Sequence, residues 1–505
     1  GLEMGLISPS EVKEYFPLMN VDDLDCALYI PSDGLVSPTD LTNALAKGAR
    51  KNGSKIVTDT TVTGFDIKDG RITGVKTDKG DIKCEGAALC AGIWSRQLAR
   101  MAGANIPILA SYHCYFITEP IEGTHKGLPF IRDPDRWHYA REEVGGLMVG
   151  QYEPNPVAFD QTDVPNDFVF HLAQENIEQF SPWLEPFYHR LPVLQEVGIK
   201  TWFNGLESFT EDQNPVLGEL PEVDGLFTAC GFNAYGVSVG AGFGMALGEW
   251  MMNGEQPFDL WSLDVRRFSK MHGAEGHMRA RALEGQGDHY QTHFPHKERK
   301  AGRPLRRSAL YDRLAGRGAV FGEKIGWERP NWFAPEGMEP RDEPSFGHAN
   351  WFSTVGDECR ACREQAVVFD QSSFAKLMVI GKDAEATLQH ICAGNIAKAP
   401  GRTTYTQMLN DKGGIEADVI VSRISDNEFY LVTGTAFGLH DSHHIRRHMP
   451  KDANATLVDV TSAYGVLGLM GPRARDICLF PRNHFREIRN IEKIGAAHGL
   501  ALLAG

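Results

Sequence analysis

Several features that mark specialised classes of protein are scarce in this chain. Only nine cysteines are spread unevenly over 505 residues, so they do not form the disulfide framework of a small secreted domain, and a reducing compartment is expected. No block of Lys and Arg is present, and the formal net charge is −15. This acidic balance argues against nucleic acid or an anionic membrane surface as the main partner. Small polar substrates or cofactors fit the composition better.

A uniformly apolar run of membrane-spanning length is also missing. The longest uncharged run, residues 225–248, contains seven glycines together with Thr228, Asn233 and Ser238. We therefore interpret it as a buried strand, a loop and a helix, and we expect no membrane span.

Metal-ligand patterns are equally sparse. Cys359 and Cys362 form a CxxC motif without the second pair of ligands that a structural zinc site needs. Four histidines follow helical spacing, but two neighbouring arginines favour a solvated basic face over a metal cluster. These histidines are His440, His443, His444 and His448. We expect no metal site.

The start of the chain lacks two further features. The chain begins with Gly1 in the segment Gly1-Leu-Glu-Met-Gly, and not with an initiator Met. The basic and apolar regions of a signal peptide are also missing there. No GxGxxG motif follows a strand near the start, so the usual pyrophosphate-binding element is absent. We expect the chain to be an internal fragment of a longer protein.

The apolar pattern that is present predicts a multidomain α/β and α+β protein, since the length allows two or three cores. The pattern of residues 105–210 predicts strands of a sheet that forms a substrate lid or floor. Residues 286–345 have the composition and weak periodicity that are typical of an interdomain connector. The expected domains are therefore 1–285 and 346–505. In the first domain the pattern predicts a helix at 38–50, strands at 55–57 and 61–65, a hairpin at 71–84, a strand at 85–92 and a helix at 94–101.

Two glycine-rich turns between a strand and a helix have the geometry that a flavin needs. One runs through Gly231 and Gly236, and a smaller one runs from Gly92 to Trp94. Glycine lets the backbone approach a flat ring, and a helix N-terminus offers amides that stabilise negative charge on it. Such turns equally allow a helix to pack closely on a sheet, so the residues alone leave both interpretations open.

Ordered motifs along the chain resemble one family. Cys90-Ala-Gly-Ile-Trp-Ser, Glu207-Ser-Phe-Thr-Glu-Asp, Cys230-Gly-Phe-Asn-Ala-Tyr-Gly-Val and Gly326-Trp-Glu-Arg-Pro-Asn-Trp-Phe are similar to D-amino-acid-oxidase-like flavoproteins of the dimethylglycine/sarcosine dehydrogenase and dimethylglycine oxidase family. Tyr405-Thr-Gln-Met-Leu-Asn-Asp-Lys-Gly-Gly-Ile-Glu-Ala-Asp418 and Leu467-Gly-Leu-Met-Gly-Pro resemble the folate-binding domain shared with glycine-cleavage T-protein. The resemblance covers essentially the whole chain.

This resemblance implies an FAD-binding domain whose Rossmann part precedes the chain, followed by the first part of a T-protein-like domain. The implied activity is FAD-dependent demethylation of a small N-methylated amino acid such as sarcosine or dimethylglycine, with one-carbon transfer to tetrahydrofolate. An electron-transfer flavoprotein or oxygen would accept the electrons, and the FAD would be covalent if a histidine outside the chain holds it. The implied location is the cytoplasm in a bacterium or the mitochondrial matrix in a eukaryote.

Two alternatives stay open beside this activity. One is a catalytically inactive relative that serves as a regulatory or binding subunit. The other is a one-carbon transferase in which the flavin half is only a scaffold.

The resemblance also assigns roles to single residues. His113 matches a substrate-site histidine, which can accept or share the amine proton, and Tyr139 matches an active-site tyrosine. Asp418 matches an acidic residue that acts on the folate during one-carbon transfer, and Tyr405 matches a folate contact. The expected flavin contacts are Val62, Gly92, Trp94, Gly231, Asn233, Tyr235, Gly236, Val237 and Ser238.

Overall fold

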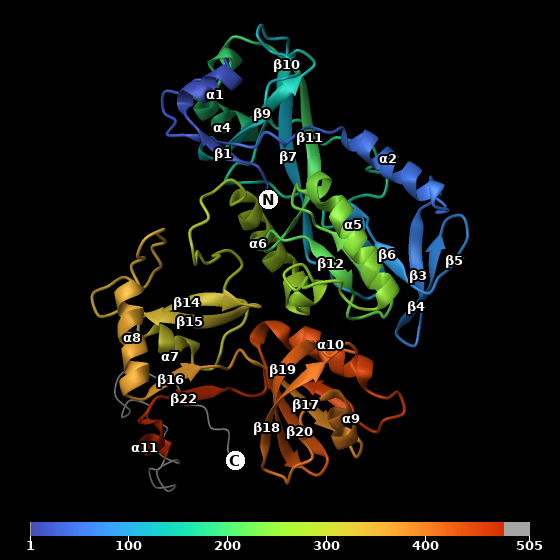
Figure 1. The fold of residues 1–505 in the computed structure, drawn as a ribbon, viewed down its shortest axis with the longest axis vertical. Coiled ribbons are helices and arrows are strands. Elements are labelled where there is room, and N and C mark those ends of the chain that lie inside the picture. The colour runs from blue at the N-terminus through green and yellow to red at the C-terminus, as the bar shows by residue number, and fades with distance from the viewer. Residues whose placement is uncertain (1, 479–505) are drawn as a thin grey trace. The chain divides into compact units, whose positions relative to one another are not determined.

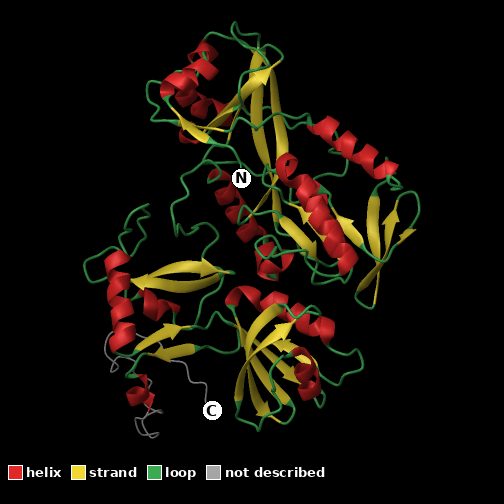
Figure 2. Ribbon diagram, in the orientation of Figure 1, coloured by secondary structure: helices red, strands yellow, loops and turns green. Residues whose placement is uncertain are grey.

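The computed structural model describes residues 2–478, which divide into two compact units. The first unit consists of Gly1–Val265 and Met278–Thr292, and the second consists of Arg266–His277 and the chain from His293 onward (Figure 1). Both units mix helices and strands (Figure 2), as the apolar pattern predicts. Within residues 2–478, no helix has the length and apolar character needed to cross a membrane.

The first unit begins with short elements that largely match the expected ones. They are β1 (Gly5–Ile7), α1 (Pro9–Tyr15), β2 (Ala27–Tyr29), α2 (Pro38–Lys51), β3 (Val62–Lys68), β4 (Arg71–Thr77), β5 (Ile82–Lys83), β6 (Ala87–Leu89) and α3 (Ser95–Met101). The strand expected at 55–57 is wrong, since these residues belong to no described strand. β-branched residues favour a strand only where a partner strand supplies packing.

A five-stranded antiparallel sheet forms the centre of the first unit. Its strands are β7 (Ile108–Thr118), β8 (Ile131–Asp133), β9 (His138–Glu143), β10 (Gly146–Gln151) and β11 (Ile199–Thr210), in the order β11-β7-β10-β9-β8. One face buries Phe116, Leu147 and Val149 against helix α4 (Ile177–Arg190), which contributes Phe180 and Phe187. The sequence pattern did not reveal α4, because two prolines interrupt its helical signal.

The opposite face of this sheet carries polar and aromatic side chains. Residues directly opposite one another in an antiparallel sheet point to the same side. One row across the sheet therefore consists of Phe203, Tyr115, Gly150, Tyr139 and Arg132, from β11 to β8. In a second row, His113 lies opposite Gly205. The register thus places His113 and Tyr139 on the same face.

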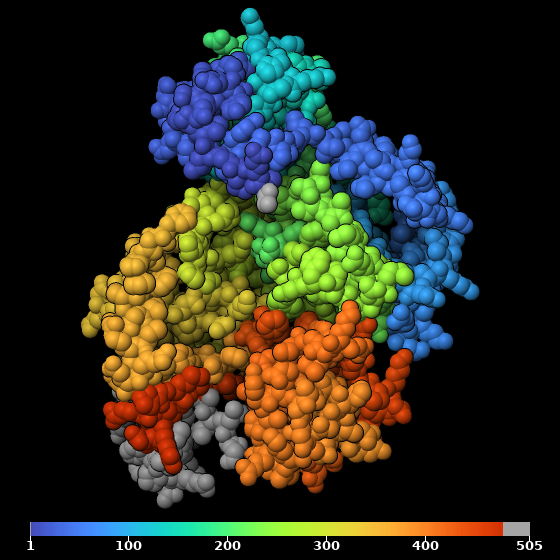
Figure 3. Space-filling model, in the orientation of Figure 1, coloured from blue at the N-terminus to red at the C-terminus, as the bar shows by residue number. Residues whose placement is uncertain are grey.

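A smaller three-stranded sheet positions the glycine-rich turn. Strand β13 (Leu226–Cys230) pairs in parallel with β6 and antiparallel with β12 (Val216–Glu219). Helix α5 (Gly236–Asn253) follows, and its second half packs Leu247 and Trp250 on this sheet. Most of the first half of α5 is exposed, and its surface is in view in Figure 3. The interpretation of residues 225–248 as a strand, a loop and a helix is confirmed.

The second unit contains another antiparallel sheet and a hairpin. The sheet has the strand order β18-β19-β20-β17-β21, and its core includes Leu377, Val419 and Phe429. Its strands are β17 (Ala375–Ile380), β18 (Thr403–Leu409), β19 (Ile415–Ser425), β20 (Glu428–Thr433) and β21 (Thr456–Asp459), and the helices α9 (Ala384–Ile391) and α10 (Gly438–His448) pack on it. The hairpin pairs β14 (Ala319–Lys324) with β15 (Trp327–Phe333).

Further elements complete the unit. Helix α6 (Glu275–Gly287) begins in the second unit and ends in the first. The others are α7 (Tyr311–Ala315), α8 (Phe352–Glu364), α11 (Ala474–Cys478) and a strand pair of β16 (Val367–Asp370) with β22 (Leu467–Met470).

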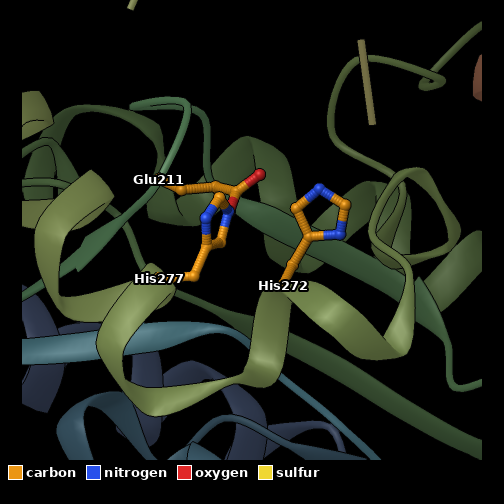
Figure 4. Close-up of side chains that lie close together, drawn as sticks. All are labelled: Glu211, His272 and His277. Carbon is orange, nitrogen blue, oxygen red and sulfur yellow. The ribbon is translucent and has the colours of Figure 1, made fainter. Parts of the chain in front are cut away.

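Two buried histidines lie in the segment Arg266–His277 of the second unit. The rings of His272 and His277 meet edge to face, with centroids 5.6 Å apart (Figure 4). His277 Nδ1 lies 3.0 Å from the carbonyl oxygen of Gly302, and His272 Nδ1 accepts a hydrogen bond from the Ser269 amide at 3.0 Å. The first contact joins this segment to the rest of its unit, and the second lies within the segment.

The sheet makes a prediction about Gly150. A Cβ added there would overlap the ring of Tyr139, which crosses β10 at this point, so Gly150→Ala should displace the ring. Overpacking of this kind costs about 1–3 kcal/mol, measurable as a lower urea midpoint of unfolding. Gly205→Ala on the same face is the matched control, because no atom lies within 4 Å of its added Cβ. Equal destabilisation by the two substitutions would contradict the packing described.

Candidate active site

His113 and Tyr139 form the centre of the polar sheet face in the first unit. Strand β7 supplies His113 and strand β9 supplies Tyr139, and the His113 Nε2 to Tyr139 Oη distance is 2.8 Å. Both side chains are buried. The sequence named the two residues separately, and the register of the sheet makes them hydrogen-bonded partners.

Burial sets the protonation states of this pair. Loss of solvent lowers the pKa of His113, and the nearby carboxylate of Glu207 offsets only part of that effect. Burial also raises the pKa of Tyr139 well above its ordinary value. At neutral pH the pair therefore consists of a neutral imidazole, which can take up a proton, and a protonated phenol.

Sequence reasoning missed four residues of this site. Tyr152 stacks on His113 with ring centroids 4.4 Å apart, and its hydroxyl donates to Glu207 Oε2 at 3.3 Å. The ring centroids of His289 and Tyr290 lie 4.4 Å and 5.0 Å, respectively, from the ring centroid of Tyr152. Glu207 stood within a motif that the sequence analysis quoted, but no role was assigned to it. The segment 278–292 brings in His289 and Tyr290 from far along the chain, and no periodicity signals this.

A cavity of about 740 Å³ opens beside this face. Gly205, opposite His113 in the sheet register, and Glu207 form part of its wall. Five of the expected flavin contacts also line it, namely Gly92, Trp94, Asn233, Gly236 and Val237. The cavity thus brings the two glycine-rich turns together on the His113 side of the sheet.

The other four expected flavin contacts lie outside the cavity lining. Val62 is the first residue of strand β3. Gly231 follows strand β13 with φ +63°, and a Cβ added to it would lie 2.8 Å from Thr210 Cγ2. The Tyr235 ring lies 5.2 Å from that of His289, and the Ser238 hydroxyl donates to the Tyr235 carbonyl. Their contacts with a flavin stay predictions.

The wall of the cavity fits a flat cofactor ring. Gly92 adopts φ +54° with no atom within 4 Å of its would-be Cβ, and Gly240 on α5 is equally open. The first turn of α5 also borders the cavity, and no side chain caps its amides. Free amides at a helix N-terminus favour negative charge. These residues suit FAD, whose isoalloxazine becomes anionic on reduction.

Asn233 has a structural part in this wall. Its Oδ1 accepts hydrogen bonds from the amide and the hydroxyl of Thr210, and its Nδ2 donates to the Gly231 carbonyl at 2.7 Å. These bonds fix the turn in spite of the unfavourable φ of +50° at Asn233. The side chain of Asn233 thus holds the turn in shape at the edge of the cavity.

In the second unit, Asp418 and Tyr405 lie on adjacent strands β19 and β18. The Tyr405 hydroxyl donates to Asp418 Oδ2 at 3.0 Å, and Gln407 Nε2 donates to Oδ1 at 3.3 Å. The hydrogen bond to Asp418 raises the pKa of Tyr405, which therefore stays a donor. The sequence named Asp418 and Tyr405 but missed Gln407, which faces Asp418 directly in the strand register.

Helix α10 corrects one expectation. The expected solvated face is wrong for His440, His443 and His444, which are all buried. His440 Nδ1 lies 2.9 Å from Asp441 Oδ1, and burial lowers the pKa of His443 to about 3. The prediction of an exposed face relied on Arg446 and Arg447, which belong to the last turn of the helix. The buried histidines lie in the turns before it.

Comparison with protein families divides the chain into three matched regions. Residues 1–250 match the family described as FAD dependent oxidoreductase, and residues 253–308 match the FAD dependent oxidoreductase central domain. Residues 310–479 match the GCVT N-terminal domain. An FAD-dependent oxidoreductase domain is thus followed by a folate-binding domain, and the two domains imply FAD and tetrahydrofolate as cofactors.

Curated relatives match 94% of the chain. Human mitochondrial sarcosine dehydrogenase is 36% identical and is covered over 56% of its length, and human mitochondrial dimethylglycine dehydrogenase is 33% identical, also with 56% covered. The mitochondrial pyruvate dehydrogenase phosphatase regulatory subunit of Mus musculus is 36% identical, with 55% covered. The chain spans about half the length of these relatives. The chain carries an FAD-dependent oxidoreductase region followed by a GCVT domain and matches these relatives over 94% of its length, so it belongs to the dimethylglycine/sarcosine dehydrogenase family.

Proposed function

We propose that this protein oxidises a small N-methylated amino acid and passes the released one-carbon unit to tetrahydrofolate. The observation that carries the proposal is the buried His113–Tyr139 pair, on the sheet face beside the cavity that the two glycine-rich turns border. Sarcosine and dimethylglycine stand in the names of two relatives. We further propose an electron-transfer flavoprotein or oxygen as the electron acceptor, and the bacterial cytoplasm or the mitochondrial matrix as the location.

The side chains of the first unit would prepare the amine for oxidation. A secondary or tertiary amine enters as a cation, and it must lose its proton before its methyl group can be oxidised. Neutral His113 can take that proton at Nδ1, the ring nitrogen that does not face Tyr139, when Nε2–H donates to the Tyr139 hydroxyl oxygen. Tyr139 and Tyr152 keep their own protons and hold the imidazole in place. FAD, when bound, accepts the hydride from the methyl group.

The second unit would act on the one-carbon unit. Asp418 presents an exposed carboxylate held by Tyr405 and Gln407. A carboxylate at this place can accept a proton from, or stabilise positive charge on, a reacting folate nitrogen.

A regulatory role without catalysis is the second candidate, because one relative is named as a regulatory subunit. A chain that only binds partners has no need of a buried histidine hydrogen-bonded to a buried tyrosine. The retained His113, Tyr139 and Asp418 therefore favour the enzyme.

Substrate-dependent flavin reduction tests the oxidation. The FAD-loaded protein is mixed anaerobically with sarcosine, dimethylglycine or 4-methylaminobutanoate. Its flavin absorbance at about 450 nm should disappear, because the amine passes a hydride to the flavin. Stopped-flow absorbance measures the rate. If none of these amines bleaches the flavin, the proposed oxidation is wrong.

The protonation state of His113 predicts how the reduction depends on pH. Because burial lowers the pKa of His113, its proton returns only below the ordinary value of about 6.5. The rate should therefore be steady above that value and fall as the pH drops through the lowered pKa. His113→Asn should reduce the rate by about 100-fold or more and remove this acid limb. An unchanged acid limb in this variant would assign the ionisation to another group.

The role of Asp418 separates the two half-reactions. Asp418→Asn should leave the rate of flavin reduction unchanged, but should lower the yield of methylene-tetrahydrofolate by about 10-fold or more and release formaldehyde instead. Chromatography of the folate products measures this yield. Asp426→Asn, at an exposed turn of the same sheet, is the matched control. Normal folate product from the Asp418 variant would exclude the proposed role.

A further inference from the structure

The strand that carries Asp418 contains an extra residue. In the pairing of β19 with β18, Asp418 lies opposite Gln407, and the register then shifts so that Glu416 has no partner residue on β18. Glu416 is therefore the additional residue of a β-bulge, two positions before Asp418. Such bulges redirect side chains and are frequent beside functional sites.

This bulge decides which way Asp418 points. Side chains alternate between the two faces of a strand, so one residue more or less before Asp418 turns it over. Without the extra residue, Asp418 would lie opposite Thr406, whose side chain is buried on the other face of the sheet. It would then lose its hydrogen bonds from Tyr405 and Gln407. The bulge thus places the carboxylate on the exposed face.

Both carboxylate oxygens of Glu416 have partners. Oε1 accepts a hydrogen bond from Asn410 Nδ2 at 3.0 Å, and Asn410 Oδ1 accepts hydrogen bonds from the amides of Lys412 and Gly414 in the turn before β19. Oε2 forms an ion pair with His440 Nε2 at 3.6 Å, and His440 belongs to helix α10, which packs on the same sheet (Figure 1). The bulge is thus connected to the turn and to the helix.

His440 lies between two carboxylates. Its Nδ1 is 2.9 Å from Asp441 Oδ1, and Asp441 Oδ2 accepts a hydrogen bond from the Thr433 hydroxyl. The two ring nitrogens can donate to both carboxylates only when the imidazole is protonated. Burial alone would lower the pKa of His440, but the bonds to Asp441 and Glu416 raise it. The contact with His440 in turn lowers the pKa of Glu416 to about 2.

Other charged or titratable groups also lie near His440. Arg266, in the segment Arg266–His277 of the same unit, opposes the protonation of His440. His443 and His444 on the same helix are neutral, because burial lowers their pKa values to about 3 and about 4, respectively. The two carboxylates therefore outweigh the remaining neighbours of His440.

We propose that His440 is a positioning residue, which acts through Glu416 to hold the bulge and so directs Asp418 toward the folate. The inference rests on the proposed function, because it takes Asp418 as the group that acts on the one-carbon unit. It adds that Asp418 is productive only while the ion pair of Glu416 with His440 is intact. A displacement of roughly 1 Å at a reacting group costs up to about 100-fold in rate, so a loosened bulge has a large effect.

The test follows the one-carbon unit in the FAD-loaded protein. Sarcosine and tetrahydrofolate are supplied, and excess semicarbazide traps any formaldehyde that escapes to solvent. Chromatography then measures methylene-tetrahydrofolate, and anaerobic stopped-flow absorbance measures the flavin reduction. The second measurement reports on the first unit alone.

Glu416→Gln and His440→Gln should each lower the folate product by about 10-fold and leave flavin reduction within about twofold, because Asp418 is displaced and the first unit is untouched. Glu416→Gln is the milder change, since it keeps the size of the side chain and leaves His440 paired with Asp441. His448→Gln, at a half-buried histidine of the same helix, is the matched control and should change neither quantity.

A positioning role also makes the losses non-additive. In the Asp418→Asn background, His440→Gln should lower the folate product further by less than about twofold, because the carboxylate through which it acts is already absent. A residue that only stabilises the fold would lower the product by the same factor in both backgrounds.

The charge of His440 predicts an alkaline limit to folate product formation. Because its pKa is raised, the ion pair with Glu416 is complete below the ordinary value of about 6.5 and is lost as the pH rises through the raised pKa. The yield of folate product from the unsubstituted protein should fall in that range. His440→Gln should remove this alkaline limb and give a low yield throughout.

Two results would overturn the inference. One is a normal folate product from both Glu416→Gln and His440→Gln. The other is an equal loss from His440→Gln with and without the Asp418 carboxylate. Failure of the proposed function is a different result: either no amine bleaches the flavin of the unsubstituted protein, or Asp418→Asn forms the folate product normally.

Discussion

The hydrogen bond between His113 and Tyr139 depends on the register of one antiparallel sheet. Tyr139 lies opposite Gly150 on β10, and Gly150 lies opposite Tyr115 on β7, two residues beyond His113. A shift of one residue in either pairing would turn Tyr139 or His113 toward the α4 side. Helix α4 prevents such a shift, because it buries the alternate residues of the same strands. The packing of one face thus fixes the chemistry of the other.

Burial gives this face its chemical character. A histidine in water is partly charged near neutral pH, whereas the aromatic rings around His113 exclude water and keep the imidazole neutral. The same exclusion keeps Tyr139 and Tyr152 protonated. The charge of Glu207 has the opposite effect on His113, because it stabilises the protonated imidazole and raises its pKa. His113 is therefore neutral before the substrate arrives and can accept its proton.

The glycine-rich turns have a different physical task. Asn233 locks one turn through hydrogen bonds to Thr210 and Gly231, and Gly92 leaves the other turn open. Both border the cavity on the side of the sheet that carries His113. A rigid wall without side chains allows a flat ring to approach the backbone, while the reacting groups come from the strands.

The sequence by itself determined the local elements and the family. Apolar spacing predicted helix α2, the hairpin of β4 and β5, and the strand and helix within residues 225–248, because these depend on contacts between near neighbours. Ordered motifs identified the FAD-dependent and folate-binding regions, and they named His113, Tyr139 and Asp418. Helix α4, with its internal prolines, and the burial of helix α10 left no clear trace in the local pattern.

Only the tertiary structure decided which residues share the site. Tyr152, the residue after strand β10, stacks on His113. His289 and Tyr290 reach the same cluster from a segment more than 130 residues farther along the chain. Glu207 stood in a motif, but only the fold shows that its carboxylate accepts a hydrogen bond from the Tyr152 hydroxyl. The physical reason is that side-chain charge, burial and distance are properties of the folded environment, to which residues remote in sequence contribute as much as neighbours do.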